Sequence, residues 1–246
     1  IVFGDWSSDV CSSDLSDSDG WASFDGPSEV LAEEYPCSGG MNYHEPCLKI
    51  SFADGVRDVR LKFQSSSYPA PEHLILHLHD PFYPLVVDLH YRIHPDHDLI
   101  ERWAELQNQG ELPIQIERAL SAAWQLPASS VRRISHLGGR WNDEFNLYRQ
   151  PLTPGVFQLE SRRLSSGHQH NPWFALENGL ADEQDGEVWF GVLAWSGSWK
   201  LCAETTPLER FRLLIGINDW DFAWQLDPGE IRSEEHTSEL QSPNTI

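Results

Sequence analysis

Histidine is the residue type in this sequence with the widest choice of chemistry. A dense group is formed by His73, His77, His79, His90, His94 and His97. On a β-strand His77 and His79 would share one face, as a His-x-His metal ligand pair requires. A cupin-like metal site is therefore one hypothesis, although no carboxylate has the spacing expected to complete it. Surface or packed histidines are the alternative.

A second histidine pair lies in the stretch SSGHQHNPWFAL, residues 165–176. His168 and His170 are separated by one residue, behind Gly167 and ahead of Pro172. Their spacing alone fits a metal pair, a catalytic pair or a turn that directs a strand.

Two carboxylates, Asp219 and Asp221, lie in GINDWDFAW. Glycoside hydrolysis needs one carboxyl group to protonate the leaving oxygen and another to act as nucleophile or base, ~5–9 Å away. Neighbours on one strand rarely face a sugar from opposite sides, so an Asn-Asp turn before a strand is favoured. The sequence contains no nucleophile elbow, P-loop, GxGxxG or HExxH motif.

Tryptophan is abundant, with 11 residues in the chain. Trp195 and Trp199 bracket Ser-Gly-Ser, and Trp141 follows two glycines and an arginine. Tryptophan rings can serve as platforms for sugar faces, whereas packing in the core is the alternative.

The elements that must position these residues are β-strands. Short apolar runs with period-two features are separated by turn signals such as ADG, HPDHD, NQGELP, TPG and DPG. The predicted strands are 48–53, 56–64, 73–79, 84–93, 98–108, 113–126, 155–163, 187–195, 199–205, 210–217 and 221–226. Pro113 and the Ile/Gln alternation after it favour two strands around a turn over a helix. We therefore predict an all-β fold, a large antiparallel β-sandwich with few short helices.

The net charge of the chain limits the classes of molecule that it is expected to bind. The formal net charge is −21 with a pI near 4.7, which argues against nucleic acid or an anionic membrane, because phosphate binding needs clusters of Lys and Arg. No apolar run reaches the ~18 residues of a membrane helix. The four cysteines form no CxxC motif. We expect a soluble, cytoplasmic protein that acts on a neutral ligand and has no cofactor and no metal.

The two ends of the chain are unlike the rest. Residues 9–15 read DVCSSDL and residues 232–238 read RSEEHTS. Back-translation shows that these segments can be one DNA sequence read on opposite strands, and RSEEHTSELQS resembles a translated sequencing adapter. We predict that residues 1–15 and 232–246 are non-native segments and that residues 16–231 form the native domain.

An ordered series of motifs resembles a known family. The motifs are EYPCSGGMNYHEPCLKI (34–50), ERALSAAWQLP (117–127), LGGRW (137–141), SSGHQHNPWFAL (165–176), WSGSW (195–199) and GINDWDFAWQLDPGE (216–230). Over about residues 28–231 the chain resembles the N-terminal β-supersandwich domain of glycoside hydrolase family 36, the α-galactosidases.

The resemblance implies where the chemistry is performed. In that family a (β/α)₈ barrel of ~250 residues follows this domain and carries both catalytic aspartates. The family hydrolyses terminal α-galactosides with retention. We therefore expect no catalytic residue here, and a chain that is inactive alone. In the longer parent, a homo-oligomer, this domain would support oligomerisation and lend residues to the galactose site.

The resemblance also implies individual roles. The family motif EYP-x-x-G-x-x-Asp-[Phe/Tyr]-Arg contributes to a neighbouring subunit's site, and its last three positions correspond here to Asn42, Tyr43 and His44. Asn42 and His44 depart from the family's Asp and Arg. The tryptophan of Ser-Gly-Asn-[Trp/Phe] falls on Trp199. The predicted substrate-binding residues are therefore Asn42, Tyr43 and Trp199.

Within this resemblance His168 and His170 are expected to hydrogen-bond the backbone around a turn, with Pro172 ending the preceding ladder. Two other hypotheses stay open. One is a stand-alone carbohydrate-binding β-sandwich with Trp195, Trp199 and Trp141 as platforms, and the other is the cupin-like metal protein.

Overall fold

Strands dominate the computed structural model, which describes residues 33–39, 44–126, 133–179, 181, 186–206 and 210–233. Within these ranges the only helical segment is the 3-10 turn η1 (Pro95–His97). All pairings between the strands are antiparallel. This confirms the predicted all-β antiparallel fold.

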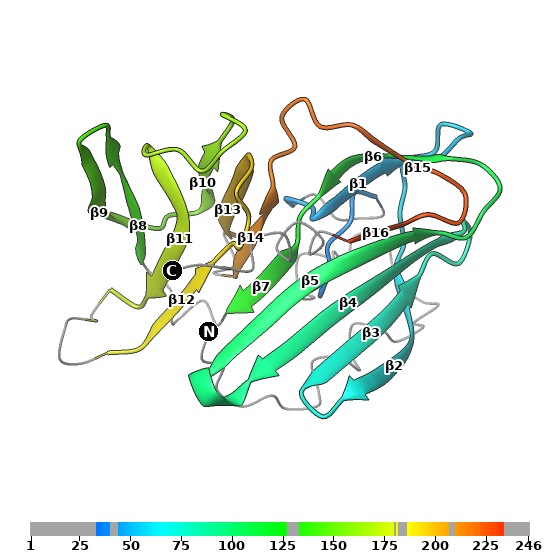
Figure 1. Cartoon of the computed structure of the whole chain (residues 1–246), viewed down its shortest axis with the longest axis horizontal. Coiled ribbons are helices and arrows are strands. Elements are labelled where there is room, and N and C mark those ends of the chain that lie inside the picture. Colours follow the sequence, from blue (N-terminus) through cyan, green and yellow to red (C-terminus); the bar gives the residue numbers. More distant parts are fainter. Residues whose placement is uncertain are drawn as a thin grey trace, which may run out of the picture. The chain divides into compact units, whose positions relative to one another are not determined.

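The chain divides into two compact units. The first unit contains the chain up to Ala119 and again from Ala223, and the second unit lies between these two residues. The first unit contains β1 (Leu48–Ser51), β2 (Lys62–Ala70), β3 (His73–His79), β4 (Leu85–His94), β5 (Leu99–Asn108), β6 (Ile114–Ala119), β15 (Trp224–Leu226) and β16 (Ile231–Ser233). They form a sheet of order β1-β6-β15 and a sheet of order β16-β5-β4-β3-β2, whose long strands are cyan to green in Figure 1. Leu85, Val87 and Leu89 alternate along β4 into the core, as period-two patterning requires.

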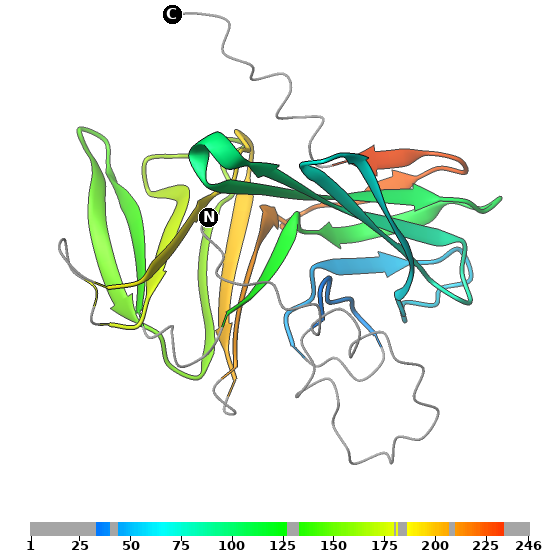
Figure 2. The same cartoon turned by 90° about the horizontal axis from the view of Figure 1, so that it is seen from below.

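The second unit, Leu120–Phe222, holds the motifs of interest. Its strands are β7 (Ala122–Leu126), β8 (Arg133–Arg140), β9 (Asp143–Pro151), β10 (Gly155–Ser161), β11 (His170–Glu177), β12 (Val188–Val192), β13 (Trp199–Thr205) and β14 (Phe211–Ile217). They form two sheets of order β10-β13-β14-β7 and β12-β11-β8-β9, coloured green to orange in Figure 2. Strands β13 and β14 are buried along almost their whole length and form the middle of the first of these sheets.

The observed strands differ from the predicted ones in several places. Strands β8, β9, β11 and β16 were not predicted. The predicted strand 113–126 is divided between β6 and β7, which belong to different sheets. Strand β2 covers Lys62–Ala70 instead of residues 56–64. The turn predicted around Pro113 is confirmed, because β5 ends at Asn108 and β6 begins at Ile114.

The predicted boundary at the C-terminal end falls inside a strand. Arg232 and Ser233 belong to β16, where Arg232 and Ser233 pair with Leu106 and Glu105 of β5. The guanidinium carbon of Arg232 lies 3.9 Å from the ring centroid of Trp224. Residues 1–15 and 234–246 lie outside the described residues, so the assignment of the two ends as non-native stays a prediction.

Candidate functional site

Three of the sequence motifs come together at one end of the second unit. The loop that joins β10 to β11 is tied to the Trp195–Ser198 turn by hydrogen bonds. The backbone N–H of Leu164 donates to Oγ of Ser198 at 2.9 Å, and Oγ of Ser166 donates to the carbonyl of Trp195 at 3.2 Å. The N–H of Ser166 donates to the carbonyl of Ser196 at 3.1 Å. The SSGHQH and WSGSW motifs therefore form one piece of structure.

Asn218, from the GINDWD motif, fixes the same region from the end of β14. Its side chain is only 3% exposed. Its amide nitrogen lies 3.1 Å from a carboxylate oxygen of Glu160 and 3.0 and 3.2 Å from the carbonyls of Ser161 and Trp199. Its amide oxygen accepts the N–H of Trp220 at 2.9 Å. One buried amide thus connects β10, β13 and the chain after β14.

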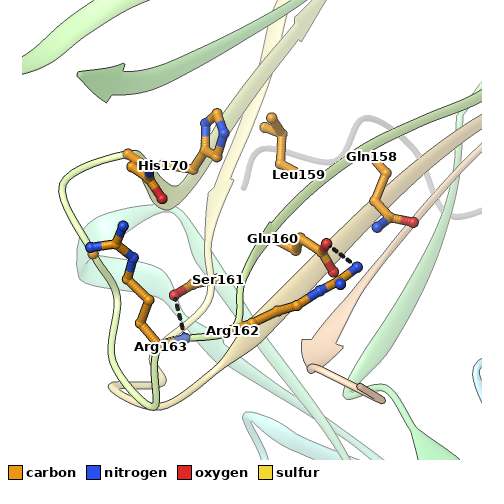
Figure 3. Close-up of a pocket in the computed structure, with 9 residues that line it drawn as sticks. Gln158, Leu159, Glu160, Ser161, Arg162, Arg163 and His170 are labelled. Carbon is orange, nitrogen blue, oxygen red and sulfur yellow. Dashed lines mark hydrogen bonds and ion pairs between the residues drawn. The ribbon is translucent and has the colours of Figure 1, made fainter. Parts of the chain in front are cut away.

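A hollow of about 440 Å³ lies beside this junction. Polar side chains dominate its lining, and Figure 3 shows Arg163 and His170 on one side of the hollow and the Glu160–Arg162 pair on the other. Gln158 and Gln169 add two amides, and Leu159 adds apolar surface. The site therefore offers several hydrogen-bond donors and acceptors in one small space.

Only some of the charged side chains in the hollow form ion pairs with each other. Arg162 forms an ion pair with Glu160, and its guanidinium carbon lies 3.7 Å from the ring centroid of Trp220. Both contacts restrict the Arg162 side chain. Arg163 has no ion-pair partner among the residues that the structure describes, and its side chain is exposed. The hollow therefore contains one neutralised carboxylate and one guanidinium that is available to a ligand.

His170 lines the hollow and has an unusual hydrogen-bonding state. Its Nδ1 atom is buried and has no hydrogen-bond partner within the described ranges, and the same holds for Nδ1 of His136. The two imidazole centroids are 5.9 Å apart. Burial lowers the pKa of both residues from the usual 6.5, and for His136 the neighbouring His170 lowers it further. Both rings are therefore neutral at pH 7.

The expected roles of His170 and Pro172 need correction. Instead of bonding the backbone, Nδ1 of His170 is unpaired within the described chain. Pro172 lies inside β11, which covers His170–Glu177, so it does not end the strand, and its carbonyl accepts the N–H of Leu193 at 2.9 Å. The pairing with β8 is interrupted between His170 and Phe174, and the residue pairs with β12 begin at Trp173.

The predicted substrate-binding residues have different positions. Asn42 and Tyr43 lie outside the described residues, and the neighbouring His44 is half-buried. Trp199 is 0% exposed, and its backbone is paired with Ser161 and Ile217 in the middle of a sheet. Its contact with a sugar stays a prediction.

The other two tryptophans that were considered as platforms differ from Trp199 and from each other. Trp195 is half-buried and donates its indole N–H to the carbonyl of Ser198 at 2.9 Å, whereas Trp141 is 80% exposed. The structure adds Trp220, 60% exposed above Arg162, which the sequence did not single out as a platform.

Several histidines of the first unit bond to neighbours across the sheet. Nδ1 of His77 lies 2.8 Å from Oδ1 of Asp88, and Nε2 of His73 lies 3.0 Å from Nδ1 of His90. The His90 ring stacks on Trp103 with centroids 4.6 Å apart. In the part of the chain that the structure describes, no group of three or more His, Cys, Asp or Glu residues is arranged to hold a metal ion. These residues do not supply the ligands that the cupin-like hypothesis requires.

The carboxylates of GINDWD do not form a catalytic pair. Asp219 lies 2.5 Å from the ammonium nitrogen of Lys200. Asp221 adopts a positive φ of 55°, as in a turn.

Among the described residues, no helix is long and apolar enough to cross a membrane.

Comparison with known proteins connects these motifs to a family. The glycosyl hydrolase family 36 N-terminal domain matches residues 6–227. Among curated relatives, α-galactosidase AgaA of Geobacillus stearothermophilus is 33% identical over 220 residues, which cover 82% of this chain and 30% of AgaA. Probable α-galactosidase G of Aspergillus terreus is 30% identical over 229 residues, which cover 86% of this chain and 31% of the relative.

Solved structures agree with the sequence relatives. The crystal structure of the family 36 α-galactosidase AgaA from Geobacillus stearothermophilus matches with a TM-score of 0.79 at 30% identity, over 84% of this chain and 31% of AgaA. The galactosidase domain of the α-galactosidase–sucrose kinase AgaSK matches with a TM-score of 0.77 at 28% identity, over 83% of this chain and 31% of that domain. The chain thus spans about 30% of the length of these relatives. By the motifs, by the fold and by the extent of the match, the chain belongs to the glycosyl hydrolase family 36 N-terminal domain family.

Proposed function

We propose that this chain is the N-terminal part of an α-galactosidase that hydrolyses terminal α-galactosides with retention, and that the catalytic residues lie in a following part of the parent protein. The observation that carries the proposal is the family match over residues 6–227, in a chain that corresponds to 30% of its relative AgaA. Variants of that relative have been solved in complex with stachyose and with raffinose, which identifies the ligands of AgaA.

The chemistry of the described residues supports a non-catalytic role for this chain. Glycoside hydrolysis uses two carboxyl groups, of which one donates a proton and the other attacks the sugar or activates water. The hollow contains a single carboxylate, Glu160, which is paired with Arg162. Asp219 is engaged by Lys200.

In the parent protein, a homo-oligomer, this domain would lend contacts to the galactose site. Asn42 can donate and accept hydrogen bonds with sugar hydroxyls through its amide, and Tyr43 can add an aromatic face and a hydroxyl. Trp199 is fully buried within the described chain. The predicted contact of its ring with galactose therefore requires the ring to become accessible in the parent protein.

The test is to amplify the source DNA outward from the core, express the longer reading frame, and assay it beside this chain. We expect the longer protein to release p-nitrophenol from p-nitrophenyl α-D-galactopyranoside and galactose from raffinose, and this chain alone to release neither. In the longer protein Asn42→Ala should raise KM about fivefold, the effect of one lost hydrogen bond, whereas the matched change Asn146→Ala should leave KM unchanged. A longer protein that cleaves only other glycosides, or a reading frame that stops near Ile231, would contradict the proposal.

A further inference from the structure

We propose that the hollow between β10 and the loop leading to β11 is a binding site for a neutral sugar unit, carried by this chain itself. The site consists of Gln158, Glu160, Arg163, Gln169 and His170. It does not depend on the proposed function, because it needs neither catalytic residues nor any part of the parent beyond this chain.

The hollow has the size of a ligand site and a wall that is held in place. Its volume of about 440 Å³ is within the ~300–1,000 Å³ typical of small-molecule sites. Arg162 is clamped between Glu160 and the ring of Trp220. A wall that is already fixed loses little conformational entropy when a ligand binds.

The loop on the other side of the hollow is also anchored. Oγ of Ser161 donates to the carbonyl of Ser165 at 2.5 Å, and the N–H of Leu164 donates to Oγ of Ser198 at 2.9 Å. These bonds hold the segment from which Arg163 and Gln169 extend. The polar groups of the site are therefore presented by backbone whose position is set before a ligand arrives.

The lining of the hollow contains both hydrogen-bond donors and hydrogen-bond acceptors. Arg163 offers only donors, Glu160 offers only acceptors, and the amides of Gln158 and Gln169 offer both. Each sugar hydroxyl both donates and accepts, so a mixed set of this kind suits a neutral polyol. Arg162 neutralises the Glu160 carboxylate, so Arg163 leaves the hollow with one net positive charge, and an anion is opposed only by the net charge of −21 of the whole chain.

His170 adds a neutral imidazole to the lining of the hollow. Burial lowers its pKa, so the ring is neutral at pH 7. The ring therefore adds no charge that would favour an ion over an uncharged ligand.

The experiment is calorimetric titration of this chain at pH 7 with galactose, with raffinose and with inorganic phosphate. We expect saturable binding of galactose or raffinose. Arg163→Ala and Gln158→Ala, both at exposed side chains, should each weaken it about five- to tenfold, as expected for one lost hydrogen bond. Arg149→Ala is the matched control, because Arg149 is an exposed arginine on β9 outside the hollow. It should leave the Kd unchanged.

Three results would overturn the proposal. They are no saturable heat with either sugar, sugar binding that neither substitution in the hollow weakens, and saturable binding of phosphate in preference to sugar. Urea midpoints of each variant, measured beside the titrations, establish that a lost signal is not lost folding. A negative titration would leave the hydrolysis assay of the longer protein unaffected, so failure of this site and failure of the proposed function are distinguishable.

Discussion

At the scale of single residues, Asn218 connects more of the second unit than any motif reading of GINDWD indicates. Its amide nitrogen lies within 3.2 Å of acceptors on Glu160, Ser161 and Trp199, and it is buried. Replacement by alanine would leave several buried acceptors and the N–H of Trp220 with fewer partners. Each buried group left unsatisfied costs about 1–3 kcal/mol. We predict that Asn218→Ala lowers the free energy of unfolding by about 2–4 kcal/mol in urea denaturation.

An isosteric variant sharpens this prediction. Asn218→Asp keeps the shape but turns the donor group into an acceptor that faces two carbonyls and the Glu160 carboxylate. It should destabilise at least as much as Asn218→Ala. Asn146 donates one hydrogen bond to the carbonyl of Asp143 at 2.8 Å near the surface, so Asn146→Ala should cost less than about 1 kcal/mol. Equal midpoints for Asn218→Ala and Asn146→Ala would show that the Asn218 bonds contribute nothing.

At this scale the sequence identified the motifs around His168, Trp199 and Asp219 but did not predict that they meet in space. Of the polar residues that line the hollow it singled out only His170. Glu160 and Arg162 were not singled out, because charged residues beside a strand have the pattern of an ordinary solvated face. The burial of Trp199 also could not be read from the sequence, since alternation along a strand does not show which face is covered by another layer.

At the scale of elements, three of the strands that escaped prediction share a physical cause. Strand β9 has no fully buried residue and alternates weakly, so hydrophobic periodicity gives little signal there. Strand β11 contains Pro172, and β8 ends in two adjacent glycines followed by an arginine. Proline and glycine lower the expectation of a strand. By contrast β4, β13 and β14 carry strong apolar patterns and were predicted close to their observed ranges.

Gly216 lies at a close approach between β14 and the segment that leads into β7. A Cβ atom at this position would lie 2.5 Å from the backbone nitrogen of Ser121 and 2.6 Å from Cα of Leu120. Both are backbone atoms inside a buried sheet, so they cannot move aside as a flexible side chain would. We predict that Gly216→Ala lowers the free energy of unfolding by about 1–3 kcal/mol, the range that is typical of an overpacked core.

The matched control for this element is Gly167→Ala. Gly167 has a backbone angle open to alanine, and an added Cβ would meet only Cδ of Arg163 at 3.4 Å. Its urea midpoint should remain within about 0.5 kcal/mol of the parent chain. If Gly216→Ala unfolds at the same urea concentration as Gly167→Ala, the close approach of β14 to residues 120 and 121 is not a constraint on the fold.

At the scale of the whole molecule, the two units share one electrostatic property. Each contains a pair of neighbouring histidines whose pKa is lowered chiefly by burial. They are His73 and His90 in the first unit and His136 and His170 in the second. Both folded units therefore favour neutral imidazole. Lowering the pH should decrease the free energy of unfolding of both units.

The sign of the pH dependence follows from linkage. A histidine whose folded pKa lies below its unfolded value of 6.5 binds fewer protons when folded, so the free energy of unfolding rises with pH through that window. The contribution is complete above pH 6.5 and is lost as the pH falls toward the lowered values. We predict that urea midpoints fall between about pH 6.5 and pH 5, before carboxylates with pKa values near 4 begin to protonate.

A salt series separates this mechanism from repulsion across a chain of net charge −21. Burial opposes protonation by desolvation, which salt does not screen, whereas surface repulsion weakens when the Debye length falls to about 3 Å in 1 M salt. The midpoint should therefore fall by a similar amount over this pH range at low and at high salt. A midpoint that rises on acidification, or a decline that 1 M salt abolishes, would mean that surface charge and not histidine burial sets the acid sensitivity of both units.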